Sequence, residues 1–334
     1  MKKTISTLFI CLVLAGCSPL ETDDNFEYEI IITDKATNLR GLNSSSDDYN
    51  SDLSYPAARS EIYFSSNRNS FGDNFDIICK AIDMSFHKED SILNFSIPTN
   101  NSYTLYQTDL LKLINSQHNE LGPYSFSKDG WNYFFYANDE SGNFDIKYVY
   151  TPILDWSTYE GQRRLFGPTS VTLTNSTSDD LYPTINLDKS KLLFCSDREN
   201  KSFDIYSINL NSTTLLHDYL NSANSVQVYK ESVLSSNAND KCPSINGNTI
   251  VFASDRAGGY GGYDLYYSKF INNQWSPPVN FGEKVNSSSD EYRPITFSFF
   301  SYFDLMIFSS NRPGGSGGFD LYCVKIGNLL TSDK

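Results

Sequence analysis

The chain has 334 residues, of which 39% are hydrophobic, 15% aromatic and 20% charged, and its formal net charge at pH 7 is −14. This apolar fraction excludes a disordered chain, and the strong negative charge argues against a nucleic-acid partner. The 23 Tyr and 23 Phe residues favour β-strands over helices.

The N-terminal residues are typical of an exported protein. Two lysines precede a short apolar run, residues 8–14, that is too short to span a bilayer. The run leads into Leu14-Ala15-Gly16-Cys17, which resembles the lipobox of bacterial lipoproteins. The resemblance implies cleavage before Cys17 and attachment of lipid, palmitate included, to Cys17. We therefore expect a signal peptide over residues 1–16.

Residues 17–26 are expected to form an acidic tether, and residues 27–330 a single domain. Ser18 replaces the aspartate that would resemble an inner-membrane retention signal, which favours the outer membrane. The acidic residues of the tether resemble the export tags of some surface-exposed lipoproteins, and a solvated linker is the alternative. The expected location is the outer membrane, on its periplasmic or its cell-surface face.

Four cysteines remain in the mature chain, and none has metal-ligand spacing or a neighbouring histidine. They are Cys79, Cys195, Cys242 and Cys323. Export permits disulfides, but small buried residues are the preferred interpretation. The three histidines are unpaired in sequence, so we expect no metal site, no catalytic triad and no cofactor.

One pattern recurs five times along the chain: an aromatic-rich strand, a polar turn, and then an aromatic residue, Asp and an aliphatic residue. The recurring aspartates are Asp76, Asp145, Asp204, Asp264 and Asp320. Four turns carry an arginine, namely Arg68, Arg198, Arg256 and Arg312. In the second repeat we assign Asp139 to the arginine position. An acid followed by a proline precedes each repeat, and in the first repeat we assign this acid to Asp52, ahead of Tyr55-Pro56.

The turn and the strand after it resemble the WD40-like repeat of TolB-type β-propellers over roughly residues 50–325. Three strands per repeat and a fourth from the linking stretch make a four-stranded antiparallel blade. Residues 39–48 resemble the stretch 284–291 that joins the last two repeats. We therefore predict an all-β fold, a β-propeller of five blades closed by an N-terminal strand that completes the last blade. Six blades would require a further unit within 82–118 or 150–170.

The recurring arginines and aspartates are interpreted as a structural network, because a ligand site normally needs asymmetric groups. A ring of arginines that binds an anion in the central channel is the alternative. The long loops depart from the repeat, and binding residues concentrate in such loops. We select the 150–168 stretch as the candidate binding loop, with Trp156, Tyr159, Arg163, Arg164 and Phe166 as its candidate residues.

These features lead us to expect a non-catalytic, lipid-anchored, monomeric propeller of the cell envelope. The TolB resemblance implies a platform that binds a protein or a glycan partner. The alternative is a carbohydrate-active enzyme or a glycan-binding protein that uses the central channel. An enzyme would need two or three carboxylates directed into the channel, and the fold alone does not decide between the two.

Overall fold

The computed structural model describes residues 26–53, 56–99, 104–153, 164–222, 225–300 and 302–330. The expected signal peptide, the lipidation site Cys17, and the loop residues Trp156, Tyr159 and Arg163 lie outside these ranges. Within them, no helix is long and apolar enough to cross a bilayer.

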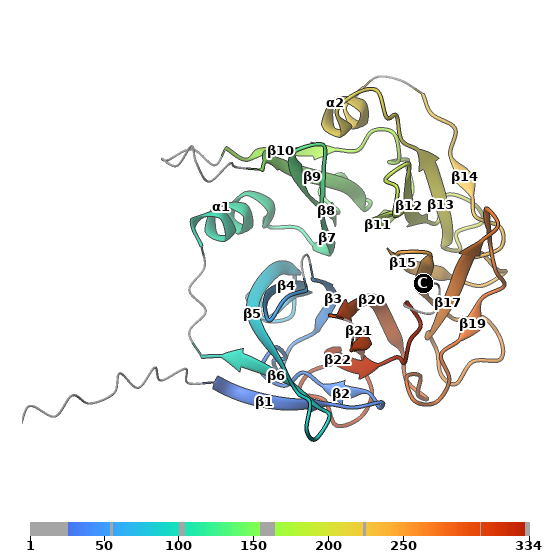
Figure 1. The fold of residues 1–334 in the computed structure, drawn as a ribbon. Helices are drawn as coiled ribbons and strands as arrows, with labels where there is room; N and C mark the ends of the chain where they lie inside the picture. The colour runs from blue at the N-terminus through green and yellow to red at the C-terminus, as the bar shows by residue number, and fades with distance from the viewer. Residues whose placement is uncertain are drawn as a thin grey trace, which may run out of the picture.

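Five antiparallel sheets stand around a common centre as the blades of a propeller (Figure 1). From the centre outward, blade 1 contains β3 (Asp48–Leu53), β4 (Arg59–Ser66), β5 (Asp76–His87), β6 (Ile92–Pro98) and β1 (Phe26–Ile32). Blade 2 contains β7 (Glu120–Lys128), β8 (Trp131–Asn138), β9 (Asp145–Pro152) and β10 (Phe166–Ser170). Blade 3 contains β11 (Asp180–Ile185), β12 (Lys191–Ser196), β13 (Asp204–Asn209) and β14 (Tyr229–Lys230).

The last two blades follow the same order. Blade 4 contains β15 (Asp240–Asn246), β16 (Thr249–Ser254) and β17 (Asp264–Ile271), with β18 (Gln274–Trp275) and β19 (Val279–Asn280) both paired to β17. Blade 5 contains β20 (Glu291–Phe299), β21 (Phe303–Ser310), β22 (Asp320–Lys325) and β2 (Thr37–Asn38). The innermost strands β3, β7, β11, β15 and β20 contact one another in this cyclic order, and β20 contacts β3 again. The predicted all-β fold with five blades is therefore confirmed.

Two short helices lie at the periphery, α1 (Leu105–Ile114) and α2 (Leu216–Leu220) (Figure 1). A capping box starts α1: the Thr104 side chain accepts from the Gln107 N–H, and the Gln107 side chain accepts from the Thr104 N–H. The stretch 82–118 thus forms the β5–β6 hairpin and α1, and not a sixth blade.

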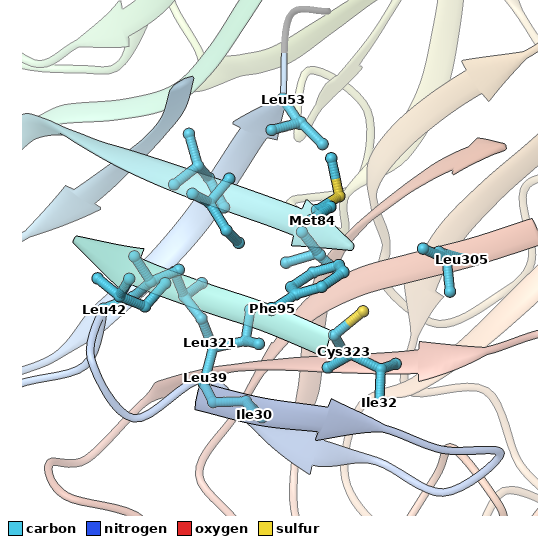
Figure 2. Close-up of a cluster of buried hydrophobic side chains, with 14 of the residues drawn as sticks. Ile30, Ile32, Leu39, Leu42, Leu53, Met84, Phe95, Leu305, Leu321 and Cys323 are labelled. Carbon is cyan, nitrogen blue, oxygen red and sulfur yellow. The ribbon is translucent and has the colours of Figure 1, made fainter. Parts of the chain in front are cut away.

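The segment before β3 joins the two ends of the ring. β2 pairs with β22 at Thr37 and Asn38, so an N-terminal strand completes the last blade as predicted. β1 adds a fifth strand to blade 1 by pairing with β6. Figure 2 shows the apolar cluster behind this joint, where Ile32 and Phe95 of blade 1 lie close to Leu305 and Cys323 of blade 5. Burial of this shared cluster stabilises the closed ring.

Asn43 bonds the first part of the chain to the last blade. Its Oδ1 accepts from the Leu321 N–H at 2.7 Å, and its Nδ2 donates to the Leu321 carbonyl at 3.0 Å. The same pair of bonds recurs at three other joints between blades: Asn115 with Ile77, Asn175 with Ile146, and Asn286 with Leu265. At the fifth joint, the Ser235 hydroxyl accepts one bond, from the Ile205 N–H at 3.2 Å.

We expect Asn43→Ala to lower the free energy of unfolding by about 2 kcal/mol, because two backbone groups of Leu321 lose their partner. Ser235→Ala removes one longer bond and should cost about 1 kcal/mol. Urea denaturation of the two variants measures the difference. Equal losses would show that the second bond of the asparagine adds nothing to closure.

Candidate functional site

Each inner strand begins at a fully buried carboxylate. These residues are Asp48, Glu120, Asp180, Asp240 and Glu291, all 0% exposed. Asp48 accepts bonds from the Ser44 N–H and hydroxyl, and Arg68 Nη2 lies 2.5 Å from its second oxygen. Equivalent ion pairs are Arg198–Asp180 and Arg256–Asp240 at 2.5 Å and Arg312–Glu291 at 2.9 Å. Charge-assisted bonds of this kind are strong, and they fix the start of each inner strand.

The position of Asp48 corrects our assignment of the first repeat. Asp48, and not Asp52, is equivalent to the acids of the other blades, because it pairs with Arg68 in the same way. The mistake arose because Tyr55-Pro56 imitates the X-Pro of the other repeats, whereas Ser51 stands at the equivalent place in blade 1.

The recurring aspartates make separate hydrogen bonds of their own. Asp264 accepts from the N–H groups of Tyr260 and Gly261, and Asp320 accepts from those of Ser316 and Gly317. The other three accept from side chains: Asp76 from Asn69, Asp145 from Ser141, and Asp204 from Lys230. The arginines Arg68, Arg198, Arg256 and Arg312 instead bond the inner-strand acid of their own blade. This pairing gives the anion-binding arginine ring no support.

Blade 2 departs from the others at a different residue from the one assigned. Asp139 accepts from the Asn119 N–H at 2.9 Å, just as Asn67 accepts from the Asp47 N–H in blade 1. Asp139 is therefore equivalent to Asn67, and the next residue, Glu140, stands at the arginine position. Glu120 consequently has no ion pair within the described residues. Ser116 and Asn138 donate to it at 2.6 and 2.7 Å, yet burial raises the pKa of Glu120 to about 7.

Glu120 should make stability depend on pH. Between its ordinary pKa of 4.5 and its folded pKa of about 7, the folded chain holds a proton that the unfolded chain releases. Stability therefore falls as the pH rises through this window, by about 2 to 3 kcal/mol. Glu140→Arg supplies the missing guanidinium and should reduce this fall. Glu140→Gln, which only breaks the pair with Lys147, should keep it. Thermal unfolding midpoints from pH 4 to 8 measure the slope, and equal slopes would contradict the assignment.

Two residues beyond each buried acid, the inner strand bulges. The bulge residues all have positive φ: Asn50 (61°), Gly122 (61°), Tyr182 (54°), Cys242 (56°) and Arg293 (43°). Each lies at a register shift in the ladder between the inner and second strands. A bulge redirects a side chain out of the regular alternation. Arg293 of blade 5 donates to the carbonyls of Pro243 in blade 4 and Pro123 in blade 2, both at 3.1 Å, so its side chain links three blades at the centre of the ring.

Above these bulges lies an open cavity of about 430 Å³ at the mouth of the channel. Its walls come mainly from blades 1, 4 and 5, with Tyr182 of blade 3. The lining residues are Asp47, Tyr49, Phe75, Tyr182, Lys241, Tyr263, Asp290, Tyr292 and Phe319. A volume of this size is within the range of small-ligand pockets.

Five aromatic rings form a continuous arc around the cavity. Tyr49 lies between Phe75 and Phe319, with ring centroids 4.8 and 5.8 Å away. Tyr292 continues the arc, 6.0 Å from Phe319 and 4.7 Å from Tyr263. Burial raises the pKa of Tyr49 and Tyr292, so both hydroxyls stay protonated and can donate hydrogen bonds. The arc offers apolar faces and hydroxyl donors together.

Two carboxylates face the same cavity. Asp47 accepts from the Phe319 N–H at 2.8 Å, and Asp290 accepts from the Tyr263 N–H at 2.9 Å. In blades 2 and 4 the same bond is made by an uncharged residue, Asn119 or Asn239. The bond between blades therefore does not require the negative charge that Asp47 and Asp290 carry at the cavity.

The two described residues of the candidate binding loop, Arg164 and Phe166, lie elsewhere. Phe166 packs at the outer edge of blade 2, stacked 5.1 Å from Tyr150, and Arg164 lies 4.9 Å from the Phe166 ring. Neither residue lines the cavity. The residues that line the cavity were not predicted from the sequence, because most of them belong to the repeat. The detectable signal was the residue after each buried acid, which is Tyr49, Lys241 or Tyr292 in three blades and leucine in the other two.

No protein-family model and no curated protein matches this chain. Solved structures resemble it along most of its length. A GH43_1 enzyme from Xanthomonas citri is 7% identical, with 87% of this chain and 90% of that chain covered and a TM-score of 0.50. A thermostable family-43 glycoside hydrolase is 10% identical, with coverage of 84% and 89% and a TM-score of 0.49. A putative TolB from Agrobacterium tumefaciens is 12% identical, with coverage of 84% and 77% and a TM-score of 0.38.

These comparisons correct the functional expectation. The solved structures that resemble the chain are mostly described as glycoside hydrolases. They contradict the expectation of a non-catalytic interaction platform. At 7% identity the resemblance itself shows the fold, so the function is argued from the cavity.

Proposed function

We propose that this protein is carbohydrate-active and takes a sugar into the cavity at the channel mouth. The observation that carries the proposal is the combination of an aromatic arc with two carboxylates around one open cavity. The C–H faces of a sugar ring are apolar and pack on aromatic rings, while its hydroxyls need polar partners. The neighbouring folds named as glycoside hydrolases agree with this proposal.

Asp47 and Asp290 are the candidate catalytic pair. Glycoside hydrolysis uses two carboxyl groups, one that protonates the leaving oxygen and one that attacks the sugar or activates water. Both aspartates lie at the rim of the cavity, and each is oriented by a backbone N–H of the last two blades. The reaction needs fixed carboxyl groups, and these two are each held by a backbone bond beside the aromatic wall.

Asp47→Asn and Asp290→Asn test the pair without disturbing the fold, because asparagine already makes the same bond in blades 2 and 4. We expect each variant to lose at least about 100-fold in turnover of the oligosaccharide that the wild type cleaves. The assay is release of reducing ends across a panel of plant and bacterial oligosaccharides.

Asp179→Asn is the matched control, because Asp179 accepts from the Phe144 N–H at 2.9 Å but does not line the cavity. Calorimetric titration of the same panel into wild type and Tyr292→Ala measures binding separately. If no sugar binds, or if the Tyr292 variant binds as well as wild type, the proposal is wrong.

We also propose that the chain is a lipoprotein of the outer membrane, anchored through Cys17. The apolar segment 8–14 and the lipobox Leu14-Ala15-Gly16-Cys17 support this assignment. Anchoring would hold a carbohydrate-active propeller close to the glycans of the envelope.

Cys17→Ser should abolish incorporation of labelled palmitate and shift the protein from the membrane fraction to the soluble fraction after cell lysis. Cys11→Ser is the control, because Cys11 lies in the expected signal peptide and should leave labelling intact. Labelling that survives Cys17→Ser would overturn the assignment.

A further inference from the structure

Lys241 at the cavity and Arg293 beside it have no carboxylate partner among the described residues. Lys241 lines the cavity with its Nζ 3.7 Å from the centre of the Phe203 ring and 6.0 Å from that of Tyr263. No hydrogen bond or ion pair to another described residue involves its ammonium group. The equivalent residues in the other blades are Tyr49, Leu121, Leu181 and Tyr292. Lys241 is therefore a departure from the repeat, located where a ligand would bind.

Arg293 adds a second positive charge, beside the Tyr182 ring. Its side chain is 0% exposed, and within the described part of the chain its guanidinium donates only to the carbonyls of Pro123 and Pro243. Its Nε has no hydrogen-bond partner there. The guanidinium lies 5.4 Å from the centre of the Tyr182 ring, and Tyr182 lines the cavity. A buried charge without a counter-charge is unfavourable, and an anion above the Tyr182 ring would relieve it.

The carboxylates determine where such an anion can lie. Asp290 is engaged through both oxygens, by the Tyr263 N–H and by Asn311 Nδ2 at 3.1 Å, and Asp47 by the Phe319 N–H. Both would repel a negative group on the ligand. A negative group is instead stabilised on the side of the cavity near Phe203 and Tyr182, where the charges of Lys241 and Arg293 lie.

We propose that the sugar bound in this cavity carries an anionic group, a carboxylate or a sulfate, which Lys241 recognises with support from the buried charge of Arg293. This inference rests on the proposed function and specifies its substrate class. The ammonium group acts as a point charge and binds either anion, so the experiment must separate uronic acids from sulfated sugars.

The test is calorimetric titration of the full chain with four probes of equal length. These are a galacturonic acid trisaccharide, a sulfated galactose trisaccharide, a neutral galactose trisaccharide and a chitosan trisaccharide with free amines. One acidic probe should bind at least tenfold more tightly than the neutral one, and Lys241→Gln should abolish this preference. Lys201→Gln is the matched control, because Lys201 is an exposed lysine in the turn that precedes Phe203 and should leave the preference intact.

Each outcome of the titrations supports or contradicts the inference. Tighter binding of the galacturonic acid probe assigns a uronic acid, and tighter binding of the sulfated probe assigns a sulfated sugar. Three outcomes would overturn the inference: equal binding of neutral and acidic probes, tighter binding of the amine probe, or a preference that survives Lys241→Gln. In each of these cases, sugar binding that Tyr292→Ala weakens would still support the proposed function. If no probe binds and no other sugar of the panel does, both proposals are wrong.

Discussion

The buried carboxylate at the start of each inner strand is the contact on which the other features of the mouth depend. In blade 1 the Ser44 N–H and hydroxyl and Arg68 bond the Asp48 carboxylate and fix the strand at that residue. The neighbouring positions are fixed as a result. Asp47 bonds the Phe319 N–H of blade 5, Tyr49 lines the cavity, and Asn50 bulges into the channel. One electrostatic contact thus sets the roles of four consecutive residues.

Five copies of this four-residue segment surround the axis, and their differences make the site. They read Asp-Asp-Tyr-Asn, Asn-Glu-Leu-Gly, Asp-Asp-Leu-Tyr, Asn-Asp-Lys-Cys and Asp-Glu-Tyr-Arg in blade order. The second position is always acidic, because it holds the blade together. The other three positions vary in charge and size, so the cavity is aromatic and acidic toward blades 1 and 5 and basic toward blade 4. A repeated scaffold with variable positions at one end of the channel can acquire a ligand site without a change of fold.

The repeat made the architecture predictable from the sequence. A strand, a turn and a second strand repeated five times determine the blades, and the likeness between 39–48 and 284–291 revealed the closure. The exact position of single residues within a repeat could not be predicted in the same way. Asp52 was chosen over Asp48 because of a nearby proline, and Asp139 over Glu140 because the turn of blade 2 is short. The site was missed for a physical reason: side chains from seven separate segments converge at the mouth, and a sequence shows only the segments one at a time.

The route by which the chain enters the fold has a mechanical consequence. The ladder of β1 with β6 extends from Phe26 to Ile32, whereas β2 pairs with β22 at Thr37 and Asn38 alone. A pulling force on the segment ahead of Phe26 therefore meets the long ladder of blade 1 before it reaches the two-residue pairing that closes the ring. The β1–β6 ladder therefore takes up the load before the closing pair of strands does. A chain pulled at its N-terminus would bear the tension in blade 1 while its cavity kept its shape.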